Sequence, residues 1–442
     1  MRLHLLLLPV FLLAGVACGQ RLGGKLRPEE LAERLGQLVT AGDTTALVTL
    51  AVQQCRGGPA DSSRACYEDY FLQLAKGERV RLALGALEQL GKRDPQVERD
   101  GHGYTHVIGI RAWKPGDDVS AKFRSCTGLY QSGCYHGVIQ SWFTQAGPID
   151  SARVNQLCDL IAADPADRWL RFQCVHGLGH GFEMVWNWEL PRALTGCDWL
   201  VSSWDRESCY GGAFMENAVA AATGSHHTSV HALQASARDA APPTAAGQDM
   251  QGMKGMGHDH APDTKTITFK MLDSTDALYP CSIVDPKYHR ACYELQGGII
   301  LRRNGRDWTA AAGTCDRAPL NVRSACYQSI GTMTAGMTVG DNKNAASECA
   351  HGDPGYQPFC FSGVVKNRID VTADPKDGIA FCQEIPAGAN RTQCYVAVGQ
   401  QISVLHSVDL AGRAKACALA GKEGEGECRV GAALDNTVKP TP

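Results

Sequence analysis

The cysteines of this chain recur at regular intervals. Eighteen of the nineteen form nine neighbouring pairs, whose members are mostly 11 or 12 residues apart, and successive pairs are 22 to 24 residues apart over most of the chain. A sustained period of about 34 to 35 residues predicts an array of repeats, which stack because no single unit can bury its apolar face alone. The pairs are Cys55 with Cys66, Cys126 with Cys134, Cys158 with Cys174, Cys197 with Cys209, Cys281 with Cys292, Cys315 with Cys326, Cys349 with Cys360, Cys382 with Cys394, and Cys417 with Cys428.

Each of these cysteines is expected to form a disulfide with its near neighbour, which closes nine short loops and leaves Cys18 unpaired. The spacing permits this connectivity but does not prove it. A set of paired cysteines of this size is typical of proteins that fold in an oxidising compartment. We therefore expect an extracytoplasmic protein.

The residues around the second cysteine of each pair also repeat. The next position is usually aromatic, and the position three residues after the cysteine is usually small, as at Gly137, Gly177 and Gly212. Segments between pairs, such as 151–162, carry apolar residues at helical spacing, and strand-like alternation is scarce. We predict an all-α solenoid of about ten helical-hairpin repeats, in which the small residue lets neighbouring helices pack closely.

This pattern resembles Sel1-like and tetratricopeptide-like helical-hairpin repeats over roughly Thr45 to Leu434. The period, the inferred hairpins and the cysteine pairing carry the resemblance, and the consensus motifs of those families are not matched. The resemblance implies a stacked helical architecture with a concave surface for a protein partner of the cell envelope. It implies nothing about catalysis.

The N-terminus is typical of a bacterial secreted protein. Arg2, an apolar run and small residues predict a signal peptide over residues 1–17. Residues 15–18 (GVAC) resemble a lipobox, so we expect Cys18 to carry lipid and to anchor the protein to a membrane; secretion without lipid is the alternative. Gly19 is not the aspartate that retains lipoproteins at the inner membrane, so we expect the outer membrane, on its periplasmic side or at the cell surface.

The gap between Cys66 and Cys126 is longer than the period allows. Its 60 residues match one further unit without its two cysteines, which would fall near Leu90 and Gly101. This unit is therefore expected to be a hairpin without a disulfide.

The gap between Cys209 and Cys281 is longer still. It contains the segment 223–266, which lacks apolar periodicity and is typical of a long disordered loop. The expected organisation is thus N-terminal repeats over residues 18–222, this loop, C-terminal repeats over 267–434 and a flexible tail over 435–442.

Histidines gather in three successive units of the N-terminal half. His136 and His176 both lie two residues after a second cysteine, and His180 follows His176 by four residues, which places two imidazoles on one face of a helix. His102 and His106 have the same spacing in the unit without cysteines. Because side chains on closely stacked helices can converge, we predict that these five histidines form a transition-metal site.

The next unit supplies Met215 and Glu216 as further candidates. Met215 lies six residues after Cys209, as His180 does after Cys174, and would be a metal ligand. Glu216 would bind the metal, orient a histidine or act as a general base on metal-bound water, and it is the one catalytic candidate in the sequence. A solvated position on the helix surface is the alternative for Glu216.

The loop over 223–266 carries a second candidate set of ligands. Thioethers and imidazoles together suit copper, whereas a thioether is a poor ligand for zinc. We therefore expect copper as the metal, with zinc or iron as alternatives. The loop residues are His226, His227, His231, Met250, Met253, Met256, His258 and His260.

Composition narrows the function further. The formal net charge is −3, so no basic footprint indicates nucleic-acid binding. No nucleophile elbow, P-loop, dinucleotide fingerprint or haem-attachment motif occurs. Three classes of protein stay open: a copper-binding protein of the cell envelope, a metal-dependent hydrolase or oxidase, and a scaffold that binds an envelope partner.

The lipid anchor predicts where the protein fractionates. In cells that make Cys18→Ala, the protein should move from the membrane fraction to the soluble extracytoplasmic fraction, because the acylated thiol is the expected attachment. Immunoblots of the two fractions measure this, and an unchanged distribution would show that residues 15–18 are not a lipobox.

Overall fold

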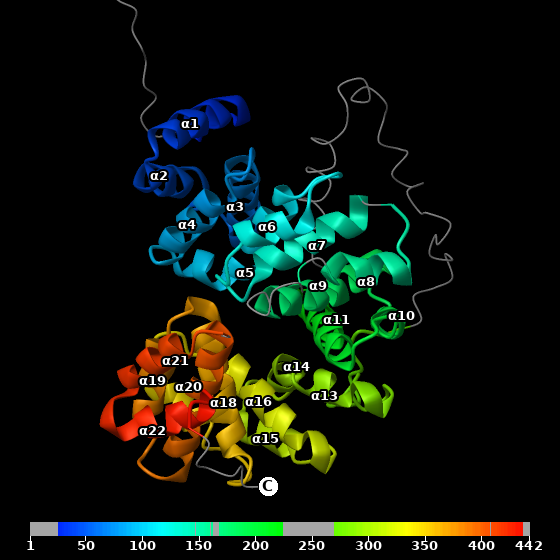
Figure 1. Cartoon of the computed structure of the whole chain (residues 1–442), viewed down its shortest axis with the longest axis vertical. Helices are drawn as coiled ribbons and strands as arrows, with labels where there is room; N and C mark the ends of the chain where they lie inside the picture. Colours follow the sequence, from blue (N-terminus) through cyan, green and yellow to red (C-terminus); the bar gives the residue numbers. More distant parts are fainter. Residues whose placement is uncertain are drawn as a thin grey trace, which may run out of the picture.

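The computed structural model describes residues 25–145, 147–159, 161, 168–223, 269–406 and 408–435. Over these residues the regular elements are α-helices and short 3-10 helices, without a strand, and consecutive helices pack against one another along the array (Figure 1). The predicted all-α solenoid of helical hairpins is therefore confirmed. No helix of the described part is long and apolar enough to cross a membrane.

The helices alternate between two roles along the array. After α1 (Pro28–Ala41), the first helices of the units are α2 (Thr44–Cys55), α4 (Val80–Gly91), α6 (Val119–Ser125), α8 (Ser151–Asp159), α10 (Leu190–Cys197), α15 (Trp308–Cys315), α17 (Asn342–Glu348), α19 (Pro375–Glu384) and α21 (Leu410–Cys417). The second helices are α3 (Ala60–Leu74), α5 (Pro95–Ala112), α7 (Gly133–Gln145), α9 (Arg168–Val185), α11 (Ser203–Thr223), α13 (His289–Tyr293) with α14 (Gly297–Arg303), α16 (Leu320–Met337), α18 (Gln357–Thr372), α20 (Ala389–Leu405) and α22 (Gly421–Gly431). Two 3-10 helices, η4 (Pro286–Tyr288) and η5 (Ala418–Ala420), lie between them.

All nine predicted disulfides are present, each between near neighbours in the sequence. They join Cys55 to Cys66, Cys126 to Cys134, Cys158 to Cys174, Cys197 to Cys209, Cys281 to Cys292, Cys315 to Cys326, Cys349 to Cys360, Cys382 to Cys394, and Cys417 to Cys428. The predicted connectivity is therefore confirmed.

In most units the disulfide joins the first helix, at or near its end, to the second helix. Cys382 of α19 is bonded in this way to Cys394 of α20, and Cys417 at the end of α21 is bonded to Cys428 of α22. All four of these cysteines are buried between the helices that they join. The bond holds the hairpin closed without a large core. In the unit of Cys281, turns over residues 277–283 replace the first helix.

Aspartate caps begin most of the first helices. In seven of them the aspartate side chain accepts a hydrogen bond from a backbone N–H two or three residues later, which satisfies a group that the helix leaves unpaired. These residues are Asp43, Asp118, Asp150, Asp307, Asp341, Asp374 and Asp409. Where the residue after a second cysteine is aromatic, its side chain is buried, as Tyr67, Tyr327 and Tyr395 show.

Neighbouring second helices meet backbone to backbone at glycines. A Cβ added to Gly179 of α9 would lie 2.1 Å from the Cys209 carbonyl oxygen, and one added to Gly212 of α11 would lie 1.9 Å from the His176 carbonyl oxygen. Only glycine permits so close an approach. The same reciprocal contact joins three further helix pairs, α5 and α7 through Gly109 and Gly137, α16 and α18 through Gly331 and Gly363, and α20 and α22 through Gly399 and Gly431. The predicted role of the small residue is confirmed.

These contacts correct the predicted register of the unit without cysteines. The glycine that meets the next unit lies five residues after the second cysteine, as Gly331 does after Cys326. In α5 this contact belongs to Gly109, whose added Cβ would lie 2.0 Å from the Cys134 carbonyl oxygen. Tyr104 therefore occupies the cysteine position, three residues beyond Gly101. The prediction counted forward from Cys66 with a step and a loop of ordinary length, whereas counting back 22 residues from Cys126, the shortest step seen elsewhere, leads to Tyr104.

The two halves of the array are continuous. Helix α11 packs against α13 and α14, and Asp198, just after α10, accepts hydrogen bonds from Lys287 Nζ at 2.9 Å and from the Tyr288 hydroxyl at 2.8 Å. In Figure 1 the chain runs from α1 through α11 and then into the C-terminal helices. The predicted signal peptide, Cys18 and the ligands of the segment 223–266 lie outside the described residues.

The glycine contacts predict opposite effects of one substitution at two sites in α16. Gly331→Ala should lower the free energy of unfolding by about 1–3 kcal/mol or more, because its Cβ would meet the Cys360 carbonyl oxygen at 1.9 Å and backbone cannot move aside easily. Gly336→Ala, in the same helix with nothing within 4 Å, should be neutral or stabilise by up to about 1 kcal/mol. Urea denaturation of both variants measures this, and equal effects would contradict the packing.

Candidate metal centre

The five predicted histidines come together in the interior of the array. They lie on three adjacent second helices, His102 and His106 on α5, His136 on α7, and His176 and His180 on α9 (Figure 1). Four of them are buried and His102 is partly buried. The His136 ring lies 4.5 to 5.7 Å, between ring centroids, from each of the other four rings.

The glycine contacts explain why the rings meet. A Cβ on Gly137 would lie 2.1 Å from the His106 carbonyl oxygen, so α5 and α7 approach most closely where their histidines lie. Gly177 of α9 packs on Ile139 of α7, whose side chain an added Cβ would reach at 2.9 Å. With Tyr104 at the cysteine position, His106 takes the same place in its unit as His136 and His176, and His102 lies one turn earlier.

The first histidine pair has its Nε2 atoms turned toward each other. His102 Nδ1 lies 2.8 Å from the Tyr130 carbonyl oxygen, which can only accept, so this nitrogen carries the proton and Nε2 carries the lone pair. His106 Nδ1 lies 3.0 Å from Gln140 Oε1, and the two Nε2 atoms lie 3.0 Å apart.

The second pair repeats this arrangement. His176 Nδ1 donates to the Ser208 carbonyl oxygen at 3.1 Å, and His180 Nδ1 donates to the Glu216 carboxylate at 2.8 Å. The two Nε2 atoms lie 3.4 Å apart. A carboxylate on the far nitrogen of a histidine is a recurrent support of metal-binding imidazoles, because it orients the ring and increases its basicity.

Two facing lone pairs repel each other unless a proton or a metal ion lies between them. Bonds of 2.0–2.1 Å place two nitrogens about 3.4 Å apart on a tetrahedral ion and about 2.9 Å apart at a right angle. The observed separations of 3.4 and 3.0 Å match these values. Each pair could therefore hold a metal ion with little movement of the rings.

His136 completes both pairs. The ligand atoms of His102, His106 and His136 lie within 4.8 Å of one another, and so do those of His136, His176 and His180. Among the described residues neither ring nitrogen of His136 has a hydrogen-bond partner, although its side chain is buried. A buried polar group without a partner destabilises the fold, so the arrangement favours a ligand role over a structural one.

The surroundings keep two of the five imidazoles, those of His136 and His176, neutral. Burial, followed by the neighbouring His180, holds the pKa of His136 well below its usual value. Burial and His180 lower the pKa of His176 in the same way, and Lys366 of α18 adds to this shift. Neutral imidazoles are the form that binds metals.

A second buried carboxyl lies close to Glu216. Glu183, on α9 three residues after His180, is fully buried, and its two carboxyl oxygens have no hydrogen-bond partner among the described residues. Burial, and then the negative charge of Glu216, raise the pKa of Glu183 well above its usual value. A bound dication would offset both effects.

The structure tests the predictions for Glu216 and Met215 to different extents. Glu216 lies where the sequence placed it, buried and bonded to His180, so it orients an imidazole in this structure. Met215 lies half-buried on the same helix, and its role as a ligand stays a prediction. The sequence analysis missed Gln140, which lies six residues after Cys134, the offset that His180 has from Cys174.

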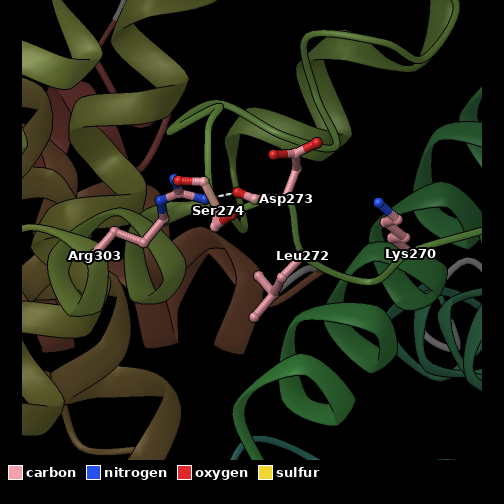
Figure 2. A pocket seen from close by; sticks show the side chains of 5 residues that line it. All are labelled: Lys270, Leu272, Asp273, Ser274 and Arg303. Atoms are coloured by element: carbon pink, nitrogen blue, oxygen red, sulfur yellow. Dashed lines mark hydrogen bonds between the residues drawn. The ribbon is translucent and has the colours of Figure 1, made fainter.

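A surface hollow lies apart from the histidines. Figure 2 shows its lining residues, Lys270, Leu272, Asp273, Ser274 and Arg303. The Arg303 guanidinium donates to the carbonyl oxygens of Asp273 and Ser274, so its charge is already engaged within the wall. None of the five histidines lines the hollow, and we assign it no function.

Removing the central imidazole should not weaken the metal-free protein. His136→Leu replaces a buried polar group without partners by an apolar side chain of similar size, so the free energy of unfolding at pH 7.5, after removal of metal, should be unchanged or higher. Chemical denaturation measures this. A loss of about 2 kcal/mol or more would show that His136 is a structural residue.

The lowered pKa values also predict how acid affects the metal-free protein. As the pH falls below about 6.5, the unfolded chain binds protons that the buried His136 and His176 cannot, so stability should fall until their low folded pKa values are reached. His136→Leu should reduce the slope between pH 6.5 and 5 by up to about 1.4 kcal/mol per pH unit. Denaturation curves across this range measure it, and an unchanged slope would contradict the neutral buried state of His136.

Comparison with known proteins adds no relative to this description. The chain matches no protein-family model, no curated protein and no solved structure. The likeness to Sel1-like and tetratricopeptide-like repeats therefore stays one of architecture: disulfide-closed helical hairpins stacked into an array.

Proposed function

We propose that this protein binds a transition metal, copper by preference, in its buried histidine centre. The observation that carries the proposal is the facing of Nε2 lone pairs, His102 toward His106 and His176 toward His180, with their far nitrogens held by acceptors. A cation between each pair removes the repulsion. Water is excluded from most of the rings, so a metal ion is the ligand that the site suits best.

The donor atoms favour copper. Imidazole nitrogen binds copper, zinc and iron, and divalent copper binds such sites most strongly in the first transition series. Zinc and iron are the alternatives that a neutral all-imidazole site also accepts. The four buried rings imply slow exchange of a bound metal ion.

The setting of the site is proposed to be the cell envelope. Nine disulfides indicate an oxidising, extracytoplasmic environment. We further propose that Cys18 anchors the protein to the outer membrane and that the Met/His-rich segment 223–266 is a separate copper-binding element. The centre itself needs no residue of that segment.

Among the histidines of the array, only those of the centre should be needed for metal binding. In calorimetric titrations of the full-length protein with copper, the double variant His176→Ala/His180→Ala should lose a tight binding event. The matched double variant His289→Ala/His406→Ala, in C-terminal units, should keep it. Glu216→Gln should weaken the same event about 10- to 100-fold, as expected for a residue that orients a metal-binding histidine.

Circular dichroism spectra of all three variants check that they are folded. If the wild type binds no transition metal at micromolar concentration in the centre, or if the two double variants bind equally, the proposal is wrong. A scaffold that binds an envelope partner would then be the best-supported function.

A further inference from the structure

The two histidine pairs cannot share one metal ion. Two ligand atoms on a single ion can lie at most about 4.2 Å apart, twice a metal–nitrogen bond of 2.0–2.1 Å. Within the described residues, the groups whose ligand atoms all lie within 4.8 Å of one another are His102/His106/His136 and His136/His176/His180. No such group joins the first pair to the second, so the five rings form two sets of possible ligands that share His136, although the His106 and His180 rings also lie 5.8 Å apart between centroids.

Both ring nitrogens of His136 are available as ligands. Both nitrogens are buried and without a hydrogen-bond partner among the described residues, whereas the other four histidines each have Nδ1 engaged by an acceptor. Its ring lies between the pairs, with its centroid 5.3 Å from that of His106 and 4.5 Å from that of His180. A histidine that serves only one ion would be expected to have its second nitrogen bonded to the protein.

The geometry points to a two-metal centre in which His136 bridges two copper ions, one held by His102 and His106 and the other by His176 and His180. This inference rests on the proposed function and extends it from a binding site to a dinuclear one. A neutral imidazole has one lone pair, so binding of the second ion through the other nitrogen requires that the N–H proton leave to solvent. No electron transfer is involved in this step.

The surrounding charges suit two dications. The bridging imidazolate carries one negative charge, Glu216 supplies a second beside His180, and Glu183 supplies a third when it ionises. Glu183 has no partner that would explain its burial in the described structure. With only one bound ion, the negative charge of this second buried carboxylate would be less well balanced.

Copper counting combined with electron paramagnetic resonance tests the bridge. The sample is the full-length chain in which the eight histidines and methionines of segment 223–266 are serine, so that copper bound there is not counted. It is loaded with Cu(II) and freed of loose copper on a chelating resin. We expect two copper ions per chain and a spin signal that accounts for less than half of them, because an imidazolate couples the two spins antiferromagnetically.

The matched variants assign the two positions. His102→Ala/His106→Ala should bind one copper ion with its full signal, because His136, His176 and His180 remain, and His136→Ala should lose the coupling. Two ions with a full signal in the parent protein would overturn the bridge. One ion would overturn the dinuclear centre and leave the proposed function standing, whereas no bound ion would overturn both.

Discussion

The backbone contact between neighbouring second helices determines where the chemistry of this protein lies. Gly137 rests against the His106 carbonyl and Gly212 against the His176 carbonyl, at 2.1 and 1.9 Å from a hypothetical Cβ. These contacts fix the separation and the register of α5 against α7 and of α9 against α11, while α7 and α9 meet through side chains, Ile139 against Gly177 and Phe143 against Gly181. Without them, side chains two residues after each second cysteine would not converge from three successive units. The same contact recurs in the C-terminal half, at Gly331 and Gly363, where no histidines accompany it. The packing device therefore belongs to the repeat, and the histidine centre is an addition to it.

The centre is unfavourable for the metal-free fold. It buries four imidazoles, a fifth in part, and two carboxyls, and His136 and Glu183 have no hydrogen-bond partner among the described residues. The disulfides compensate in part, because each restricts the unfolded chain and is worth roughly 3 kcal/mol for a loop of about fifteen residues. Since they close every unit except that of α4 and α5, the array can stay folded before a metal ion binds. Metal binding then stabilises the folded state by mass action.

The sequence predicted the architecture and the ligand set better than the register. Cysteine spacing alone predicted the hairpins and all nine disulfides, because a short covalent loop leaves few alternatives. The i and i+4 histidines predicted which helices would carry the centre. Spacing counted forward from Cys66 placed the missing cysteine at Gly101 instead of Tyr104, because the step between units varies by a few residues and the gap has no cysteine inside it to fix the position. The partners of the histidines were harder to predict. Two of them, at Tyr130 and Ser208, are backbone carbonyls, which residue type does not indicate.

The aspartate caps at Asp307, Asp341, Asp374 and Asp409 recur with the same period and could have supported the repeat from sequence.

Anomalous diffraction from crystals of the protein, purified from its native compartment without added metal, tests the central claim most directly. Data collected on both sides of the copper, zinc and iron absorption edges identify the element and its position together. The account predicts a strong anomalous peak within about 2 Å of the Nε2 atoms of a histidine pair, between α5, α7 and α9. Crystals that diffract well but show no anomalous peak at these histidines, or show metal only outside the five-histidine cluster, would contradict it.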